Sequence, residues 1–192
     1  MCYNIRMEMT ILQFFESIRC GFATWFACLF SLFGETTFLV ALICAVYWLL
    51  DKKLGERLIV TSFSSMAVNS AAKEHYNRLR PYLTGFVSRV EIDNPFLSTL
   101  DLNPTQSFPS GHSQMSAGIF FTTAFHYRKK WIWLVAPLLT LGVMISRLYF
   151  GVHYPSDVLV GAAMGIAFAY FWALIYKFCE NVENFVFAEL VN

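Results

Sequence analysis

The sequence predicts an all-α membrane protein, a polytopic helical bundle with about six transmembrane helices. Of its 192 residues, 57% are hydrophobic and only 14% are charged, whereas soluble domains carry about 25% charged residues. The mean hydropathy of +0.51 agrees with a chain that lies largely in a bilayer. Its apolar residues form runs close to the roughly 20 residues that a membrane-spanning helix needs. We therefore expect one membrane-embedded domain over residues 1–192.

Charge and cysteine spacing exclude other classes of protein. The formal net charge is +1, which argues against a nucleic-acid binder, because such a protein carries a basic face. None of the five cysteines has the CxxC spacing of a zinc or redox site. The first nine residues are polar and of mixed charge, so we expect no signal peptide.

Three spans are expected in the first part of the chain. Residues 10–33 are the first, although their start, TILQFFESIR, is amphipathic and suits the membrane interface. Gly34 and Glu35 break this run. Glu35 lies on the outer side, where it could touch a substrate headgroup, but we interpret it as a helix cap. Residues 36–50 form the second span. Residues 58–72, the third, are rich in Ser, Thr, Asn and Ala, which suits a helix buried among other helices.

The second part of the chain begins with a long polar connection over residues 73–110, which we expect to form an outer-face loop. It holds four of the six prolines. Three further helices are expected after it, at about residues 111–126, 131–150 and 155–178. Pro155 suits the first turn of the last helix, where its missing N–H has no intrahelical partner to lose.

The positive charges orient the bundle. Alternation of the spans places the charged turns 51–57 and 128–130 on one side of the membrane, together with the N-terminus and Lys177. This side is the richer in Lys and Arg, so the positive-inside rule makes it cytoplasmic. The 73–110 connection and the 146–157 segment then share the outer face of a multi-pass cell-membrane protein.

A first polar cluster begins the 73–110 connection. Lys73 and Arg80 are seven residues apart, which is two helical turns, so they can share one face of a helix. Two cations near a membrane surface suit a phosphate group, because arginine offers a planar fork of donors and lysine a point charge. Taken alone, this cluster is more typical of cations that snorkel at a helix end.

A second cluster reads Pro-Ser-Gly-His over residues 109–112, directly before an apolar helix. Ser110 is a good N-cap, and Gly111 lets the backbone approach a ligand closely. The free N–H groups of a helix start bind anions, and His112 would stand beside the bound group. The alternative is a simple helix cap followed by an interfacial histidine.

The third cluster, SRLYFGVHYPSD over residues 146–157, lies where one apolar run ends and the next begins. Ionisable groups at such a place are costly and usually functional. Asp157 follows His153 by four residues, close enough to hydrogen-bond one imidazole nitrogen and leave the other free to attack. Arg147 can reach the same phosphate. The alternative is a structural ion pair between Arg147 and Asp157.

Together the three clusters resemble the signature motifs of the type 2 phosphatidic acid phosphatase superfamily, which are K-x6-R-P, P-S-G-H and S-R-x5-H-x3-D. Every specified position is present and in order. The matching residues are Lys73, Arg80 and Pro81 in the first motif, Pro109–His112 in the second, and Ser146, Arg147, His153 and Asp157 in the third. The resemblance implies the six-helix membrane core of that family.

The resemblance also implies a role for each residue. His153 would be the nucleophile that forms a phosphohistidine, Asp157 would orient it, and His112 would be the general acid. The phosphate oxygens would be bound by Lys73, Arg80, Ser110, Gly111 and Arg147. We expect no metal or other cofactor, because phosphoryl transfer needs positioning and positive charge, which these residues supply.

The implied activity is that of a membrane lipid phosphatase acting on a phosphomonoester or a pyrophosphate. Candidate substrates are phosphatidic acid, phosphatidylglycerophosphate and undecaprenyl pyrophosphate. A lipid phosphotransferase using the same phosphohistidine is a second hypothesis. A third is a non-enzymatic binder or transporter of lipid phosphates, against which the two histidines and Asp157 argue, because binding needs no nucleophile. The oligomeric state stays open.

Four further residues receive structural interpretations. His75 lies among unspecified positions of the first motif and is interpreted as a surface residue or as a residue that supports the site from behind. His126 is expected at the opposite side of the membrane from the three clusters. Gly161 and Gly165 have the spacing of close helix packing.

Overall fold

The computed structural model describes residues 2–92, 97 and 103–191, and over these residues the chain is helical without a strand. The all-α fold class is thereby confirmed. The α-helices of this part are α1 (Cys2–Ser17), α2 (Gly21–Leu32), α3 (Thr36–Ala45), α4 (Lys52–Tyr76), α5 (Gly111–Tyr127), α6 (Lys130–Tyr149) and α7 (Pro155–Val191). The π-helical turn η1 (Val46–Leu50) extends α3, and the 3₁₀ helix η2 (Pro81–Thr84) follows α4.

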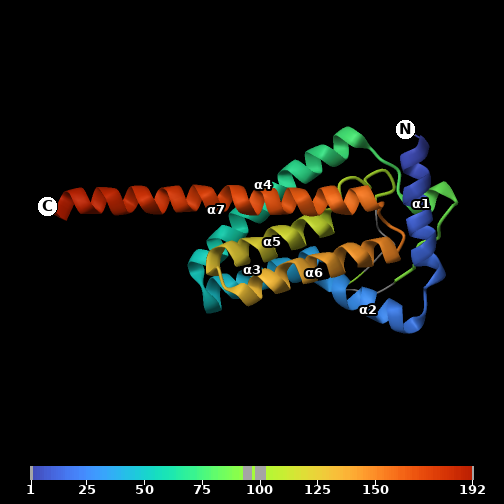
Figure 1. The fold of residues 1–192 in the computed structure, drawn as a ribbon, viewed down its shortest axis with the longest axis horizontal. Helices are drawn as coiled ribbons and strands as arrows, with labels where there is room; N and C mark the ends of the chain where they lie inside the picture. Colours follow the sequence, from blue (N-terminus) through green and yellow to red (C-terminus); the bar gives the residue numbers. More distant parts are fainter. Residues whose placement is uncertain (1, 93–96, 98–102, 192) are drawn as a thin grey trace.

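Helix α5 is the centre of the bundle, packed against α4, α6 and α7. Helix α2 packs on α6, and α3 lies against α4 and α5. Figure 1 shows α1 lying across one end of this bundle, while the C-terminal part of α7 projects beyond the other end. The core is thus formed by helices that run along the long axis, and α1 closes one end.

Two helices of the described chain are long and apolar enough to cross a membrane by themselves. They are α6 and the Pro155–Asn181 part of α7. Helix α2 together with α3 and η1 reaches the same length as a broken unit, bent by 48° between α2 and α3. The described residues therefore contain two spans, or three if the bent pair counts as one, and the total of six stays a prediction.

The expected first span over residues 10–33 is wrong. Helix α1 ends at Ser17 and α2 begins again at Gly21. Met9 and Leu12 of α1 are buried in the core, whereas Met7, Ile11 and Phe14 are exposed. The apolar run is broken at Arg19, whose guanidinium donates to the Tyr149 carbonyl and so holds the chain at the end of the bundle.

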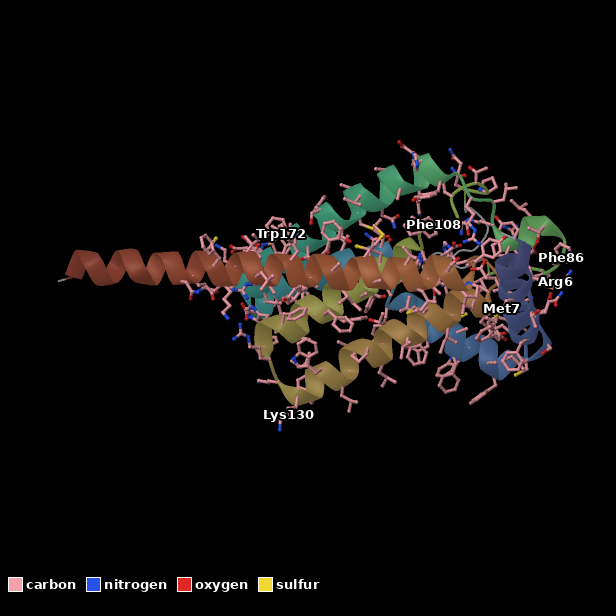
Figure 2. All side chains as sticks on the ribbon, turned by 45° about the horizontal axis from the view of Figure 1, so that its top comes forward. Arg6, Met7, Phe86, Phe108, Lys130 and Trp172 are labelled. Carbon is pink, nitrogen blue, oxygen red and sulfur yellow. The ribbon has the colours of Figure 1, made fainter. Side chains whose placement is uncertain are left out.

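The place predicted for the N-terminus is also wrong. The Glu8 carboxylate accepts hydrogen bonds from the Arg78 guanidinium and from the Ser156 backbone N–H. Helix α1 therefore lies at the end of the bundle where α4 finishes and α7 begins. His126 lies at the opposite end of the bundle, as predicted. There its imidazole contacts Asp51, with 2.9 Å between Nε2 and Oδ2. Figure 2 shows this separation: Arg6 and Phe86 lie at one end and Lys130 towards the other.

The predicted connection over residues 73–110 begins too early. Lys73 belongs to the last turn of α4, which continues to Tyr76 and ends at Asn77 in a left-handed conformation. Residues 93–96 and 98–102 of this connection lie outside the described residues. The helix thus carries Lys73 out to the end of the bundle on a rigid element.

Buried polar side chains join α4 to α5. The Asn69 amide donates to Gln114 Oε1 over 2.6 Å, and the Gln114 amide donates to the Ser65 carbonyl over 2.8 Å. All three side chains are buried, so one side of residues 58–72 lies among other helices, whereas Phe63 and Val68 on this segment are exposed. Because satisfied buried polar groups permit few alternative pairings, this polar seam of Ser65, Asn69 and Gln114 fixes the position of α4 relative to α5 along the helix axes.

Glycines bring α5 and α7 into close contact, as the Gly161 and Gly165 spacing predicted. A methyl group on Gly165 would lie 2.2 Å from the Gln114 carbonyl oxygen, and one on Gly161 would lie 2.5 Å from the Ser110 carbonyl oxygen. Both obstacles are backbone atoms, which cannot turn away. The close approach seats the start of α5 directly against the first turns of α7.

We expect Gly165→Ala to lower the free energy of unfolding by about 1–3 kcal/mol, because the methyl group forces α5 and α7 apart. Thermal unfolding in detergent, followed by circular dichroism, measures this loss. Gly21→Ala is the matched control, since no heavy atom lies within 4 Å of its added methyl group. Equal stability of the two variants would contradict the packing argument.

Candidate active site

The third cluster covers the end of α6, the turn that follows it and the start of α7. Gly151 has φ 71° there, and a side chain on it would also meet the Ser88 carbonyl oxygen at 2.5 Å, so the turn needs glycine. The turn buries His153, of which only 3% is exposed. His153 Nδ1 lies 3.6 Å from Asp157 Oδ2, and His153 Nε2 lies 3.3 Å from an Arg80 guanidinium nitrogen.

The Asp157 carboxylate is completely buried and is held by several donors. Its Oδ1 accepts from Arg78 over 2.6 Å, and its Oδ2 accepts from the Ser107 hydroxyl over 2.5 Å and from the Tyr154 backbone N–H over 3.0 Å. Its place in the first turn of α7 adds the favourable field of a helix start. Asp157 is therefore a fixed anion beside the imidazole of His153.

Arg78 and Ser107 are contacts of the site that the sequence did not predict. Besides Asp157, the Arg78 guanidinium binds Glu8 over 2.7 Å and the Ser156 hydroxyl over 2.6 Å, and it lies 3.9 Å from the centre of the Tyr154 ring. Arg78 falls at an unspecified position of the first motif. The only signal for it was a third cation within the Lys73–Arg80 segment.

Arg80 is a buried cation held in place by carbonyl groups. It is 3% exposed and donates to the Asn103 carbonyl over 2.8 Å and to the Val152 carbonyl over 2.9 Å. These neutral acceptors orient its guanidinium without neutralising it.

Burial lowers the pKa of His153 to about 3, the Arg80 cation acts in the same direction, and the Asp157 carboxylate opposes both. His153 is therefore neutral at physiological pH.

Arg147 is a second buried cation, on the last turn of α6. It is 2% exposed, and its guanidinium lies 5.0 Å from the centre of the Phe150 ring. Its Nη2 has no hydrogen-bond partner among the described residues. Buried donors are normally satisfied, so an open guanidinium nitrogen at this place is ready for an anionic ligand.

The second cluster starts α5, as predicted. Ser110 is the N-cap, and its hydroxyl oxygen accepts from the Ser113 backbone N–H. The Ser110 N–H donates to the Asp157 backbone carbonyl over 3.0 Å, which joins the start of α5 to the start of α7. Lys73 Nζ lies 3.6 Å from the point where a Gly111 side chain would begin. A cation therefore stands beside the free N–H groups of the α5 start.

His112, on the first turn of α5, contacts Glu35. Its Nε2 lies 3.1 Å from Glu35 Oε2. Glu35 occupies the N-cap position of α3, yet within the described chain its carboxylate makes no capping hydrogen bond. Glu35 thus holds the N-cap position predicted for it, while its carboxylate contacts the His112 imidazole.

The structure brings all three clusters to one end of the bundle. Each is linked to the next by a contact given above: Arg80 to His153, Ser110 to Asp157, and Lys73 to Gly111. His75 is exposed beside Tyr76, as predicted. The arrangement combines the neutral imidazole of His153, the carboxylate of Asp157 and several cations. Such groups can bind a phosphate and attack its phosphorus atom. The role of each residue stays a prediction.

Comparison with known proteins agrees with this arrangement. The family model of the PAP2 superfamily matches residues 55–180. The chain is 30% identical to the bacitracin transport permease protein BcrC of Bacillus licheniformis, over 70% of this chain and 63% of that protein. It is 26% identical to phosphatidylglycerophosphatase B of Bacillus subtilis, over 68% and 61% of the two chains. The chain thus matches less than two thirds of the length of these relatives.

A solved structure shares the fold. The crystal structure of the first transmembrane PAP2-type phosphatidylglycerolphosphate phosphatase from Bacillus subtilis superposes with a TM-score of 0.74, over 94% of this chain and 88% of that one. Sequence identity in the superposed part is 23%. The similarity therefore concerns the arrangement of the helices.

We expect Arg78→Met to lower the free energy of unfolding by about 3 kcal/mol, because it leaves the buried Asp157 anion without its cation. Thermal unfolding in detergent measures the loss. Lys53→Met, at an exposed position in the first turn of α4, at the end of the bundle away from the site, is the matched control and should change stability little. A stability of Arg78→Met equal to that of the control would show that Asp157 does not depend on this pair.

Proposed function

The chain belongs to the PAP2 superfamily, and from this we propose that it is an integral membrane lipid phosphatase that works through a phosphohistidine. It would hydrolyse a phosphomonoester or a pyrophosphate of a lipid. The observation that carries the proposal is the environment of His153. One ring nitrogen faces the buried Asp157 carboxylate, while the other faces the cation of Arg80. The proposed nucleophilic atom, His153 Nε2, therefore lies directly beside a cation that can bind the phosphate.

The first step is binding of the phosphate group. Arg80 and Arg147 are buried and pre-oriented, and Arg147 has an open donor. Lys73 and the N–H groups at the start of α5, after Ser110 and Gly111, complete a cationic lining. Charge-assisted hydrogen bonds of this kind are about twice as strong as neutral ones. Because the donors are held before the substrate arrives, little reorganisation is needed when charge develops on the phosphoryl oxygens.

The second step is attack by His153 Nε2 on the phosphorus atom. The Nδ1–H faces Asp157, which keeps the Nε2 lone pair directed at the substrate. As the P–N bond forms, the bond between phosphorus and the leaving oxygen breaks, and His112 donates a proton to that oxygen. Water then attacks the phosphohistidine, His112 takes a proton from it, the P–N bond breaks, and inorganic phosphate leaves.

The proposed setting is the outer leaflet of a cell membrane. With α1 at the end of the site, Arg6 and Arg19 join that end, so the Lys and Arg residues are divided equally between the two ends. Lys73, Arg78, Arg80 and Arg147 are held in the site itself, so we assign the far end, with its basic turns at 51–57 and 128–130 and Lys177, to the cytoplasm. Near the site, Leu79, Leu83 and Phe86 are large exposed apolar residues. We propose that they contact acyl chains, so that a lipid presents its phosphate to the site from the bilayer.

The proposal extends to three lipid classes, which are phosphatidic acid, phosphatidylglycerophosphate and undecaprenyl pyrophosphate. The name of the Bacillus subtilis relative supports the second of these. All three present a terminal phosphate on a hydrophobic tail, which is what a cationic end of an apolar bundle can recognise.

We expect His153→Ala to lower phosphate release from lipid phosphates by on the order of 10⁴-fold, because it removes the nucleophile. The measurement is inorganic phosphate released in detergent micelles containing each of the three lipids. His75→Ala is the matched control, since it removes an exposed imidazole from the same end of the bundle. Undiminished release by the His153 variant would refute its assignment as nucleophile.

The same assay distinguishes hydrolysis from phosphotransfer. Hydrolysis requires that every lipid phosphate consumed appears as inorganic phosphate. A phosphotransferase would instead produce a new phosphorylated lipid in matching amount. Tight binding of the lipid phosphates by the parent protein without turnover would favour the non-enzymatic binder.

A further inference from the structure

The break between α2 and α3 places a carboxylate against the predicted general acid. Glu35 lies in this break, and its Oε2 is 3.1 Å from His112 Nε2. The two side chains are 19% and 20% exposed. A hydrogen bond that is largely shielded from water is electrostatically stronger than one on the surface. Glu35 is therefore able to act on the imidazole of His112.

The backbone of the break between α2 and α3 packs closely against His112. A methyl group on Gly34 would lie 2.7 Å from Val143 Cγ1 and 3.1 Å from His112 Cβ. The chain at this point therefore passes as close to α5 and α6 as a backbone without a side chain can. The 48° bend between α2 and α3 turns Glu35 towards the bundle instead of along a continuous helix. From the N-cap position of α3, its carboxylate contacts the His112 ring.

The charges around His112 explain why an acid at this place needs an anion. Burial is the largest effect that lowers the pKa of His112, and Arg147 on α6 and Lys73 on α4 lower it further, whereas Glu35 raises it. His153, in the α6–α7 turn, is near enough to interact with His112 electrostatically. Nearby cations disfavour a protonated imidazole. Of the groups named here, only Glu35 is negative. Glu35 therefore offsets the same cations that the phosphate requires.

We propose that Glu35 is a positioning residue that orients His112 and stabilises its protonated form for donation to the leaving oxygen. The inference rests on the proposed phosphatase function. Glu35 accepts the Nε2–H, so Nδ1 is the ring nitrogen left to face the substrate. During formation of the phosphohistidine, the Nδ1 proton moves to the leaving oxygen as its bond to phosphorus breaks. His112 regains a proton when it activates water.

The leaving group provides the discriminating test. An alkoxide from a lipid is a poor leaving group and needs a proton as it departs, whereas a nitrophenolate departs without one. We expect Glu35→Gln to lower kcat for a dialkyl-glycerol phosphate by about 10- to 100-fold, within the range of general acid catalysis. With 4-nitrophenyl phosphate the loss should be less than about threefold. Glu35→Asp, which keeps the charge, should recover part of the lost rate.

The pH profile gives a second readout. Without the Glu35 anion, His112 loses its proton more readily, so the basic limb of kcat against pH should move to lower pH in Glu35→Gln. Glu56→Gln, at an exposed position of α4 at the far end, is the matched control and should keep the parent profile. Equal losses for both leaving groups with an unshifted basic limb would overturn the proposal. So would an undiminished rate of Glu35→Gln on the alkyl phosphate. If the parent releases no phosphate from any substrate, the proposed function fails instead.

Discussion

The buried carboxylate of Asp157 is the interaction on which this end of the molecule depends. An isolated charge in the interior costs several kcal/mol, and the cost is offset only if the charge is paired and hydrogen-bonded. Asp157 meets that demand with Arg78 from the end of α4, Ser107 from before α5, and the Tyr154 N–H from the α6–α7 turn. The hydrogen bonds to the Asp157 carboxylate thus bring three separate segments of the chain together. As a consequence, His153 lies beside this carboxylate.

The packing of α4, α5 and α7 makes this arrangement rigid, so that the cationic side chains are already in place before a ligand binds. The polar seam between α4 and α5 and the glycine contact between α5 and α7 determine where three helix ends lie. Arg80 and Arg147 are then buried without a carboxylate to neutralise them at hydrogen-bond distance among the described residues. A fold that tolerates such groups is less stable than it could be, and the proposed compensation is a phosphate bound with preorganised donors.

Sequence reasoning succeeded where the determining contacts are local. The N-cap at Ser110 and the small residues of α7 are short-range patterns. The four-residue step from His153 to Asp157 brings the two side chains together, but at 3.6 Å the predicted hydrogen bond is not formed. Sequence reasoning failed where the partner lies far along the chain. The contact of Arg78 with Asp157 spans 79 residues, and that of Glu35 with His112 spans 77, and neither spacing leaves a periodic signal. Helix α1 was misplaced because hydropathy alone does not distinguish a spanning helix from one lying across the bundle.

The central claim is that His153 carries the phosphoryl group between lipid and water. It is tested most directly by mixing the parent enzyme with excess lipid phosphate, quenching in base within a single turnover, and mapping the phosphorylated peptide by mass spectrometry. Base is used because phosphohistidine is labile in acid. We predict a phosphoryl group on the imidazole of His153. Phosphorylation of a different residue, or single-turnover release of phosphate with no covalent intermediate, would contradict the claim.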